Sequence, residues 1–101
     1  MACDLEVKYF LGDDGLSFHA QCGARHIGEI TFVRVGMDKF IVDHTSVDSD
    51  FQHAGIGLNL VRRVCDLARS QRRKIIPLCP FTVAMFSRYS EFDDVRFLRA
   101  R

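Results

Sequence analysis

The chain has 101 residues, of which 48% are hydrophobic and 27% charged, and its formal net charge is +1. This composition predicts one globular domain over residues 1–101 and excludes a disordered chain. The small net charge argues against a dedicated nucleic-acid binder, and no apolar run reaches the roughly 20 residues that a membrane helix requires.

The first half of the chain predicts an antiparallel meander. Its strand-like segments are rich in β-branched and aromatic residues, and glycine-containing turns separate them. Strands are predicted over residues 16–21, 25–35 and 39–47, with a further short strand within 1–12.

The second half changes from a period of two to a period of 3.6. Apolar residues fall on one face of a helix that begins near Ile56, and arginines fall on the other face. A strand follows at 74–79 and a second helix at 81–89. A strand that is reached through a helix is expected to run parallel to the strand before it. The order predicts an α+β fold whose helices cover a sheet, and the tail from Phe92 is left unassigned.

The segment Gln52-His53-Ala54-Gly55-Ile56-Gly57 joins the third predicted long strand to the first helix. The first N–H groups of a helix have no intrahelical partner and carry the positive end of the peptide dipoles. Glycine lets that backbone approach a phosphate closely. The pattern therefore predicts a pyrophosphate site, whereas two glycines alone would equally suit an ordinary loop. The absence of Gly-Lys-Ser/Thr excludes a P-loop.

Gln52-x-x-Gly55-x-Gly57 matches the Q/R-x-x-G-x-G/A signature of the GNAT acetyltransferases, which bind acetyl-CoA. Three further segments, His44-Thr45-x-Val47, 76–81 and 86–92, resemble the small single-domain branch of that superfamily. The resemblance extends over residues 16–95. It implies a GNAT-like mixed sheet, in which an antiparallel meander precedes a β-α-β-α unit with a splayed parallel pair.

The resemblance also implies the function, which is acetyl-CoA-dependent transfer of an acetyl group to an amine such as a protein lysine. It places the pyrophosphate on the glycine turn, the pantetheine arm along the preceding strand, and the thioester in the gap between the splayed strands. The cofactor-binding residues that it implies are Thr45, Ser46, Val47, Gln52, His53, Ala54, Gly55, Ile56, Gly57, Leu58, Phe81 and Phe86.

Two residues are candidates for the chemistry of transfer. Cys79 ends the strand at the expected gap, where it could accept the acetyl group or protonate the departing CoA thiolate. Packing as a small buried hydrophobe is the alternative for this cysteine. His44 is the candidate base, since histidine titrates near neutral pH, and Glu29 and Glu91 are alternative acids without positional support.

The chain departs from the family pattern at His53 and Ala54, where relatives often carry Gly and Lys. The missing lysine removes one phosphate contact. An alternative function is therefore a non-catalytic CoA or acyl-CoA sensor or adaptor, and a third is a small interaction domain without a cofactor.

Cys3, Cys22, Cys65 and Cys79 show no zinc-finger spacing, and the N-terminus shows no secretory signal pattern. We therefore expect reduced thiols, no metal, no membrane association, and a cytoplasmic or nuclear protein. The sequence does not indicate an oligomeric state.

Overall fold

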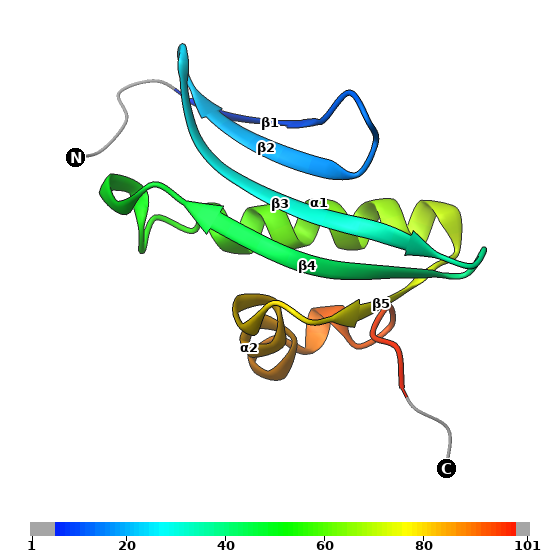
Figure 1. Ribbon diagram of the computed structural model, residues 1–101. Helices are drawn as coiled ribbons and strands as arrows, with labels where there is room; N and C mark the ends of the chain where they lie inside the picture. The colour runs from blue at the N-terminus through cyan, green and yellow to red at the C-terminus, as the bar shows by residue number, and fades with distance from the viewer. Residues whose placement is uncertain (1–5, 99–101) are drawn as a thin grey trace.

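The computed structural model describes residues 6–98 (Figure 1). A five-stranded sheet has the order β1-β2-β3-β4-β5, in which the first four strands are antiparallel and β5 runs parallel to β4. The strands are β1 Val7–Leu11, β2 Ser17–Cys22, β3 Arg25–Val35, β4 Lys39–Val47 and β5 Lys74–Pro77. This mixed sheet confirms the predicted fold class.

Two helices and two short 3-10 turns complete the chain. Helix α1 Ile56–Gln71 connects β4 to β5, and α2 Pro80–Arg88 follows β5. The 3-10 turns are η1 Ser49–Phe51 and η2 Ser90–Phe92. Pro80 suits the first turn of α2, because the N–H that proline lacks would have no helical partner there.

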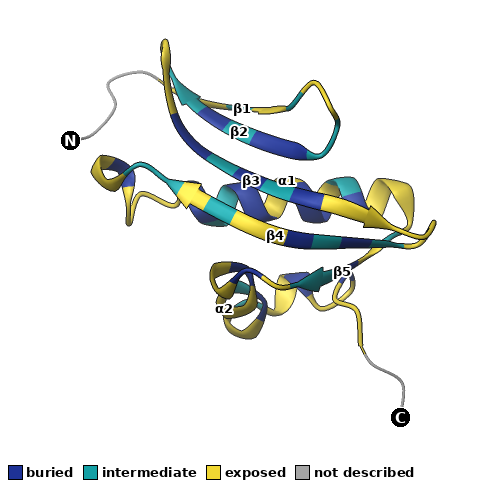
Figure 2. Ribbon diagram, viewed as in Figure 1, coloured by how far each residue is buried: buried dark blue, intermediate teal, exposed yellow. Residues whose placement is uncertain are grey.

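Helix α1 covers one face of the sheet (Figures 1 and 2). Its apolar stripe is buried against the inward side chains of the strands, among them Ile30, Phe32 and Phe40. The opposite face of the sheet is more exposed, since Phe10 keeps 44% and Val33 keeps 41% of its surface in contact with solvent. The core therefore lies on one side of the sheet, as the single helical stripe requires.

The tail that the sequence left unassigned packs against β5. Phe92 is buried and stacks on Phe86 of α2, with ring centroids 5.4 Å apart. The N–H of Ile75 donates to the carbonyl of Val95 at 2.6 Å, and Ile75 in turn accepts from Phe97 at 2.9 Å. The tail thus covers the outer edge of β5.

Arg69 of α1 anchors the same tail through its side chain. Its guanidinium makes a two-pronged contact with the Asp94 carboxylate, at 2.8 and 2.9 Å, and donates to the carbonyl of Glu91 at 2.8 Å. The guanidinium beside it holds the pKa of Asp94 below its ordinary value. Planar bidentate pairing of this kind is specific to arginine.

Two β-bulges interrupt the regular alternation of the strands. Between β2 and β3, Ala20 pairs with Gly28 and Gln21 with His26, so Ile27 is the extra residue. Between β3 and β4, Thr31 pairs with His44 and Phe32 with Val42, so Asp43 is the extra residue. Each bulge reverses which side chains face the core beyond it.

The expectation of reduced thiols is wrong for one cysteine. Cys22 is disulfide-bonded, whereas Cys65 and Cys79 have free thiols. A disulfide depends on spatial proximity, which spacing along the chain does not reveal. Cys3 lies outside the described residues. Within residues 6–98, no helix is long and apolar enough to cross a membrane.

Candidate functional site

A cleft of about 550 Å³ lies where the end of β4, the start of α1 and helix α2 meet. Nine of the predicted cofactor-binding residues line it. These are Thr45, Val47, Gln52, His53, Gly55, Ile56, Gly57, Leu58 and Phe81. The structure therefore brings the glycine turn, the strand before it and the second helix together around one cavity.

The glycine turn leaves the first N–H groups of α1 outside the helical hydrogen-bond ladder. Gly55 is the N-terminal flanking residue of α1 and has a left-handed backbone, with φ 80°. The N–H of Asn59 donates to the carbonyl of Gly55 at 3.0 Å, which is the first hydrogen bond of the helix. The N–H groups of the three residues before Asn59 consequently precede the helical ladder. A Cβ atom on Gly55 would meet nothing within 4 Å, so the space beside Gly55 is open.

The parallel strands separate beside this cleft. Pairing between β4 and β5 extends only from Lys39 to Val42 along β4 in the described part of the chain. The N–H groups of Leu78 and Cys79 both donate to the carbonyl of Val42, at 3.0 and 3.1 Å. Residues 43–47 continue along β3 without pairing to β5, which leaves main-chain groups available to an extended ligand.

The bulge at Asp43 decides which side chains of β4 reach the cleft. Phe40 and Val42 face the core before the bulge, and Thr45 and Val47 face the cleft after it. A regular strand would have turned Thr45 to the other face, because Thr45 is three positions after Val42 and side chains alternate at every position.

Cys79 lies behind Thr45 at the point where the strands separate. Its side chain is buried, with 6% exposure, and its Sγ atom is 3.4 Å from Oγ1 of Thr45. Burial by itself raises the pKa of the Cys79 thiol, but hydrogen bonding outweighs it and lowers that pKa below its ordinary value. The groups responsible are the Thr45 hydroxyl and the N–H and hydroxyl groups at the start of α2, from Phe81 and Thr82.

Thr82 is an unusual member of this group. Its side chain is 1% exposed, and its hydroxyl has no hydrogen-bond partner of normal geometry within the described residues. The hydroxyl nevertheless lies close enough to the Cys79 sulfur to help lower the pKa of that thiol, as a weak hydrogen bond would. A buried hydroxyl without a partner costs stability, so its position points to a role in the site.

Other predicted residues lie away from the lining of the cleft. His44 and Ser46 are exposed and alternate with Thr45 and Val47 along β4, so their side chains point to the opposite face. Ala54 is exposed within the glycine turn. Phe86 is buried in the core on Phe92, so Phe81 rather than Phe86 supplies the aromatic wall.

The alternative acids lie elsewhere. Glu91 accepts from Nε of Arg62 at 2.9 Å on the exposed surface of α1. Glu29 is on β3, opposite His19. Neither carboxylate lines the cleft as the described residues form it.

Four lining residues were not predicted as such: Phe51, Met85, Arg88 and Tyr89. Phe81, Met85 and Arg88 occur at i, i+4 and i+7 on α2, so they share one helical face. That spacing was visible in the sequence, but it does not distinguish a cleft wall from a core stripe.

Comparison with known proteins identifies the same architecture. The family model described as GCN5-related N-acetyl-transferase matches residues 17–95. A GCN5-like N-acetyltransferase from Staphylococcus aureus, solved by NMR, is 27% identical, with a TM-score of 0.70, and the match covers 100% of this chain and 95% of that one. No curated protein sequence matches significantly.

More distant solved structures share the fold over part of their length. Rv2747 from Mycobacterium tuberculosis, solved in complex with CoA, is 20% identical with a TM-score of 0.65; the match covers 75% of this chain and 48% of that one. A ribosomal-protein-alanine N-acetyltransferase from Brucella melitensis is 20% identical with a TM-score of 0.60, covering 84% and 63% respectively.

Proposed function

Because the chain belongs to the GCN5-related N-acetyltransferase family, we propose that it transfers the acetyl group of acetyl-CoA to a primary amine, with a protein lysine as the acceptor class. The observation that carries this proposal is the junction of three features in one cleft. An uncapped helix start, an unpaired stretch of β4 and a cysteine of lowered pKa meet there. These features suit the pyrophosphate, the pantetheine amides and the thioester in that order.

Different parts of the cleft would bind different parts of acetyl-CoA. The N–H groups at Ile56, Gly57 and Leu58 would hold the pyrophosphate, since a helix start stabilises an anion by charge and by hydrogen bonding. The free main-chain groups of 43–47 would pair with the pantetheine amides as an added strand would. Phe81 would pack against the methylene groups of that arm.

The placement of Cys79 supports the role of an acid over that of a nucleophile. Its sulfur is buried, and the side chain that faces the cleft is Thr45. The acceptor amine attacks the thioester carbonyl, the C–N bond forms, and the C–S bond breaks. The departing thiolate takes the proton of the Thr45 hydroxyl, and the Cys79 thiol restores that proton. The acceptor nitrogen releases its extra proton, and Cys79 is reprotonated from solvent.

Proton uptake from the acceptor, which the sequence assigns to His44, remains a prediction. His44 is exposed on the face of β4 that points away from the cleft. Solvent can take this proton in a cleft whose lining includes the exposed residues Gln52, His53 and Arg88. An accessible mouth also suits a large acceptor such as a protein.

Titration calorimetry with acetyl-CoA, followed by a CoA-release assay with lysine peptides, tests the proposal. Binding at about 100 times Kd should stabilise the fold by roughly 2.7 kcal/mol. Cys79→Ala should reduce turnover while leaving Kd within a few-fold. Incubation with acetyl-CoA alone should leave Cys79 unacetylated by mass spectrometry. An acetylated Cys79 would establish the nucleophilic role. Tight binding with no turnover, unchanged by Cys79→Ala, would instead support the sensor or adaptor.

A further inference from the structure

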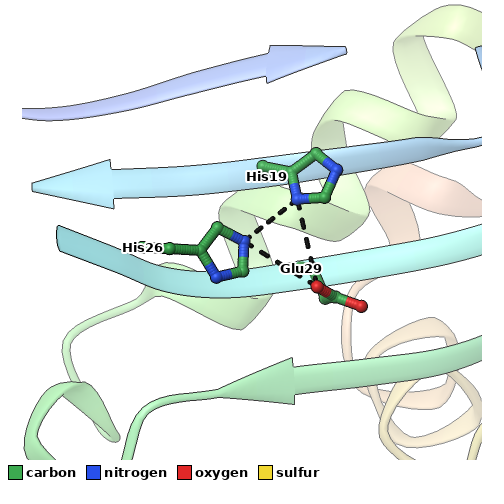
Figure 3. A group of neighbouring side chains, drawn as sticks. All are labelled: His19, His26 and Glu29. Atoms are coloured by element: carbon green, nitrogen blue, oxygen red, sulfur yellow. Dashed lines mark hydrogen bonds and ion pairs between the residues drawn. The ribbon is translucent and has the colours of Figure 1, made fainter. Parts of the chain in front are cut away.

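On the sheet face opposite α1, three potential metal ligands converge: His19 of β2 with His26 and Glu29 of β3 (Figure 3). Nδ1 of His19 is 3.0 Å from Nε2 of His26. Oε1 of Glu29 is 4.0 Å from the first of these atoms and 3.8 Å from the second. We propose that this cluster binds a divalent transition-metal ion, with Zn²⁺ as the best match. The proposal is independent of the acetyl-transfer site.

The spacing of the three atoms fits one ion. Zinc binds imidazole nitrogen and carboxylate oxygen at about 2.0–2.2 Å, so tetrahedral ligands lie about 3.3 Å from one another. The observed separations fall on both sides of that value and differ from it by at most about 0.7 Å. Small side-chain rotations close that difference. Two imidazoles and one carboxylate are a donor set that zinc accepts, and the fourth position is left for water.

The β-bulge at Ile27 assembles the cluster. Residues three apart, such as His26 and Glu29, point to opposite faces of a regular strand. The extra residue reverses the alternation, as the consecutive burial of Ile27 and Gly28 shows. His26 and Glu29 consequently share a face, and Glu29 lies directly opposite His19. Bulges re-aim side chains in this way at functional sites.

A second set of contacts orients His19. Its Nε2 atom is 3.0 Å from Oγ of Ser17, which is buried and 3.5 Å from Oδ1 of Asp14. A proton on Nε2 donated to Ser17 leaves the lone pair of Nδ1 directed at the cluster. Phe10 stacks on the His19 ring, with centroids 5.4 Å apart and planes at 24°. These contacts hold the imidazole in the orientation that a metal ligand needs, and Ser17 can accept the proton of the tautomer that leaves Nδ1 free for the ion.

The backbone makes room for this arrangement at Gly12. A Cβ atom there would lie 2.2 Å from Oγ of Ser17 and 3.1 Å from Nε2 of His19. Any other residue at position 12 would displace the hydroxyl that orients the ring. The site is also accessible, since the side chains of His19, Glu29 and His26 are 24%, 35% and 48% exposed. An ion can enter it without unfolding.

The test is titration of the tag-free full chain with Zn²⁺ alone, by calorimetry and by competition with a chromogenic chelator. We expect one ion per chain. His26→Ala and Glu29→Gln should each weaken binding at least about tenfold, and Ser17→Ala about tenfold. His53→Ala is the matched control, because His53 is exposed and is not among the converging ligands. The affinity of this variant for Zn²⁺ should equal that of the wild type.

Two measurements on the wild type do not depend on the variants folding. Zn²⁺ should shift the ring NMR signals of His19 and His26 and leave those of His44 and His53 in place. Co²⁺ should give the intense visible absorption of a tetrahedral site. The proposal is overturned if the wild type binds no Zn²⁺, if His44 or His53 shifts in place of the pair, or if folded His26→Ala binds as tightly as the wild type.

Discussion

The backbone of Gly57 lies so close to the ring of Phe81 that a Cβ atom on Gly57 would stand 2.5 Å from the ring Cζ atom. Gly57 is in the first turn of α1 and Phe81 in the first turn of α2, and both line the cleft. The second glycine of the Gln52-to-Gly57 motif therefore permits the contact between two helix starts. Packing, and not backbone conformation, requires glycine at position 57, since Gly57 is not among the residues with a positive φ.

The first prediction follows from this contact. Gly57→Ala should push the Phe81 ring, which is 36% exposed, into the space where pantetheine is proposed to lie. We expect the Kd for acetyl-CoA to rise about tenfold, or about 1.4 kcal/mol, with the fold retained. Calorimetry measures this. Combining it with Phe81→Leu should recover part of the affinity, whereas additive losses would show that the two residues are not coupled.

Gly55 provides a second prediction that separates charge from bulk. Its left-handed backbone makes Gly55→Ala cost about 1 kcal/mol of stability, although the added methyl meets no atom. Gly55→Ala should nevertheless bind acetyl-CoA within a few-fold of the wild type. Gly55→Glu should lose binding, because its carboxylate would occupy the anion site.

Gly55→Gln is the control for size in this series, and it should retain more affinity than Gly55→Glu. Equal affinity of a folded Gly55→Glu variant and the wild type would place the pyrophosphate elsewhere.

The third prediction concerns the pKa of Cys79. Burial raises this pKa, and the Thr45 hydroxyl is the strongest of the groups that outweigh it. Thr45→Val keeps the shape but removes the hydroxyl, so the pKa of Cys79 should rise. The pH dependence of Cys79 alkylation, followed by mass spectrometry, should shift to higher pH. Cys65 serves as an internal control, since burial raises its pKa to about 12. An unmoved profile would mean that the Thr45 hydroxyl does not act on the sulfur.

Thr82 gives a fourth prediction with opposite effects on stability and chemistry. Its buried hydroxyl lacks a partner among the described residues. Thr82→Val should therefore raise the free energy of unfolding by about 1 kcal/mol. The same change should raise the pKa of Cys79, to which the hydroxyl contributes. Denaturant unfolding and alkylation profiles test the two parts; a destabilised Thr82→Val protein would reveal a hydrogen bond that the geometry does not show.

The fifth prediction is alkaline destabilisation through Cys65. Burial raises the pKa of this thiol from 9.0 to about 12. Above pH 9 the unfolded chain loses the proton and the folded chain keeps it. The stabilisation present below pH 9 is therefore lost as the pH rises towards 12, at up to about 1.4 kcal/mol per pH unit.

Cys65→Ala should flatten this alkaline slope in denaturant unfolding series. Cys79→Ala is the control, because the pKa of Cys79 is lowered and its thiol is ionised in both states well above pH 9. Identical slopes for wild type and Cys65→Ala would contradict the prediction.

Local patterns in the sequence determined the element order, the glycine turn at Gly55 and the family. Alternation and helical periodicity depend only on residues close together in the chain, so they can be recognised in the sequence before the fold is known. The strand predicted over 74–79 ends at Pro77 in the structure, because the N–H groups of Leu78 and Cys79 both donate to the carbonyl of Val42. The tail beyond Phe92 pairs with Ile75 through single bridging contacts, which leave little periodic signal.

The tertiary structure alone decided which side chains share a site. The extra residues Ile27 and Asp43 reverse strand alternation, and no residue type marks a bulge reliably. One of these bulges turns Thr45 towards Cys79, and the other brings His26 beside His19. His44, which the sequence made the candidate base because of histidine chemistry, faces away from the cleft because of the bulge at Asp43. Sequence carries local preference, whereas register between strands is settled only when the whole core packs.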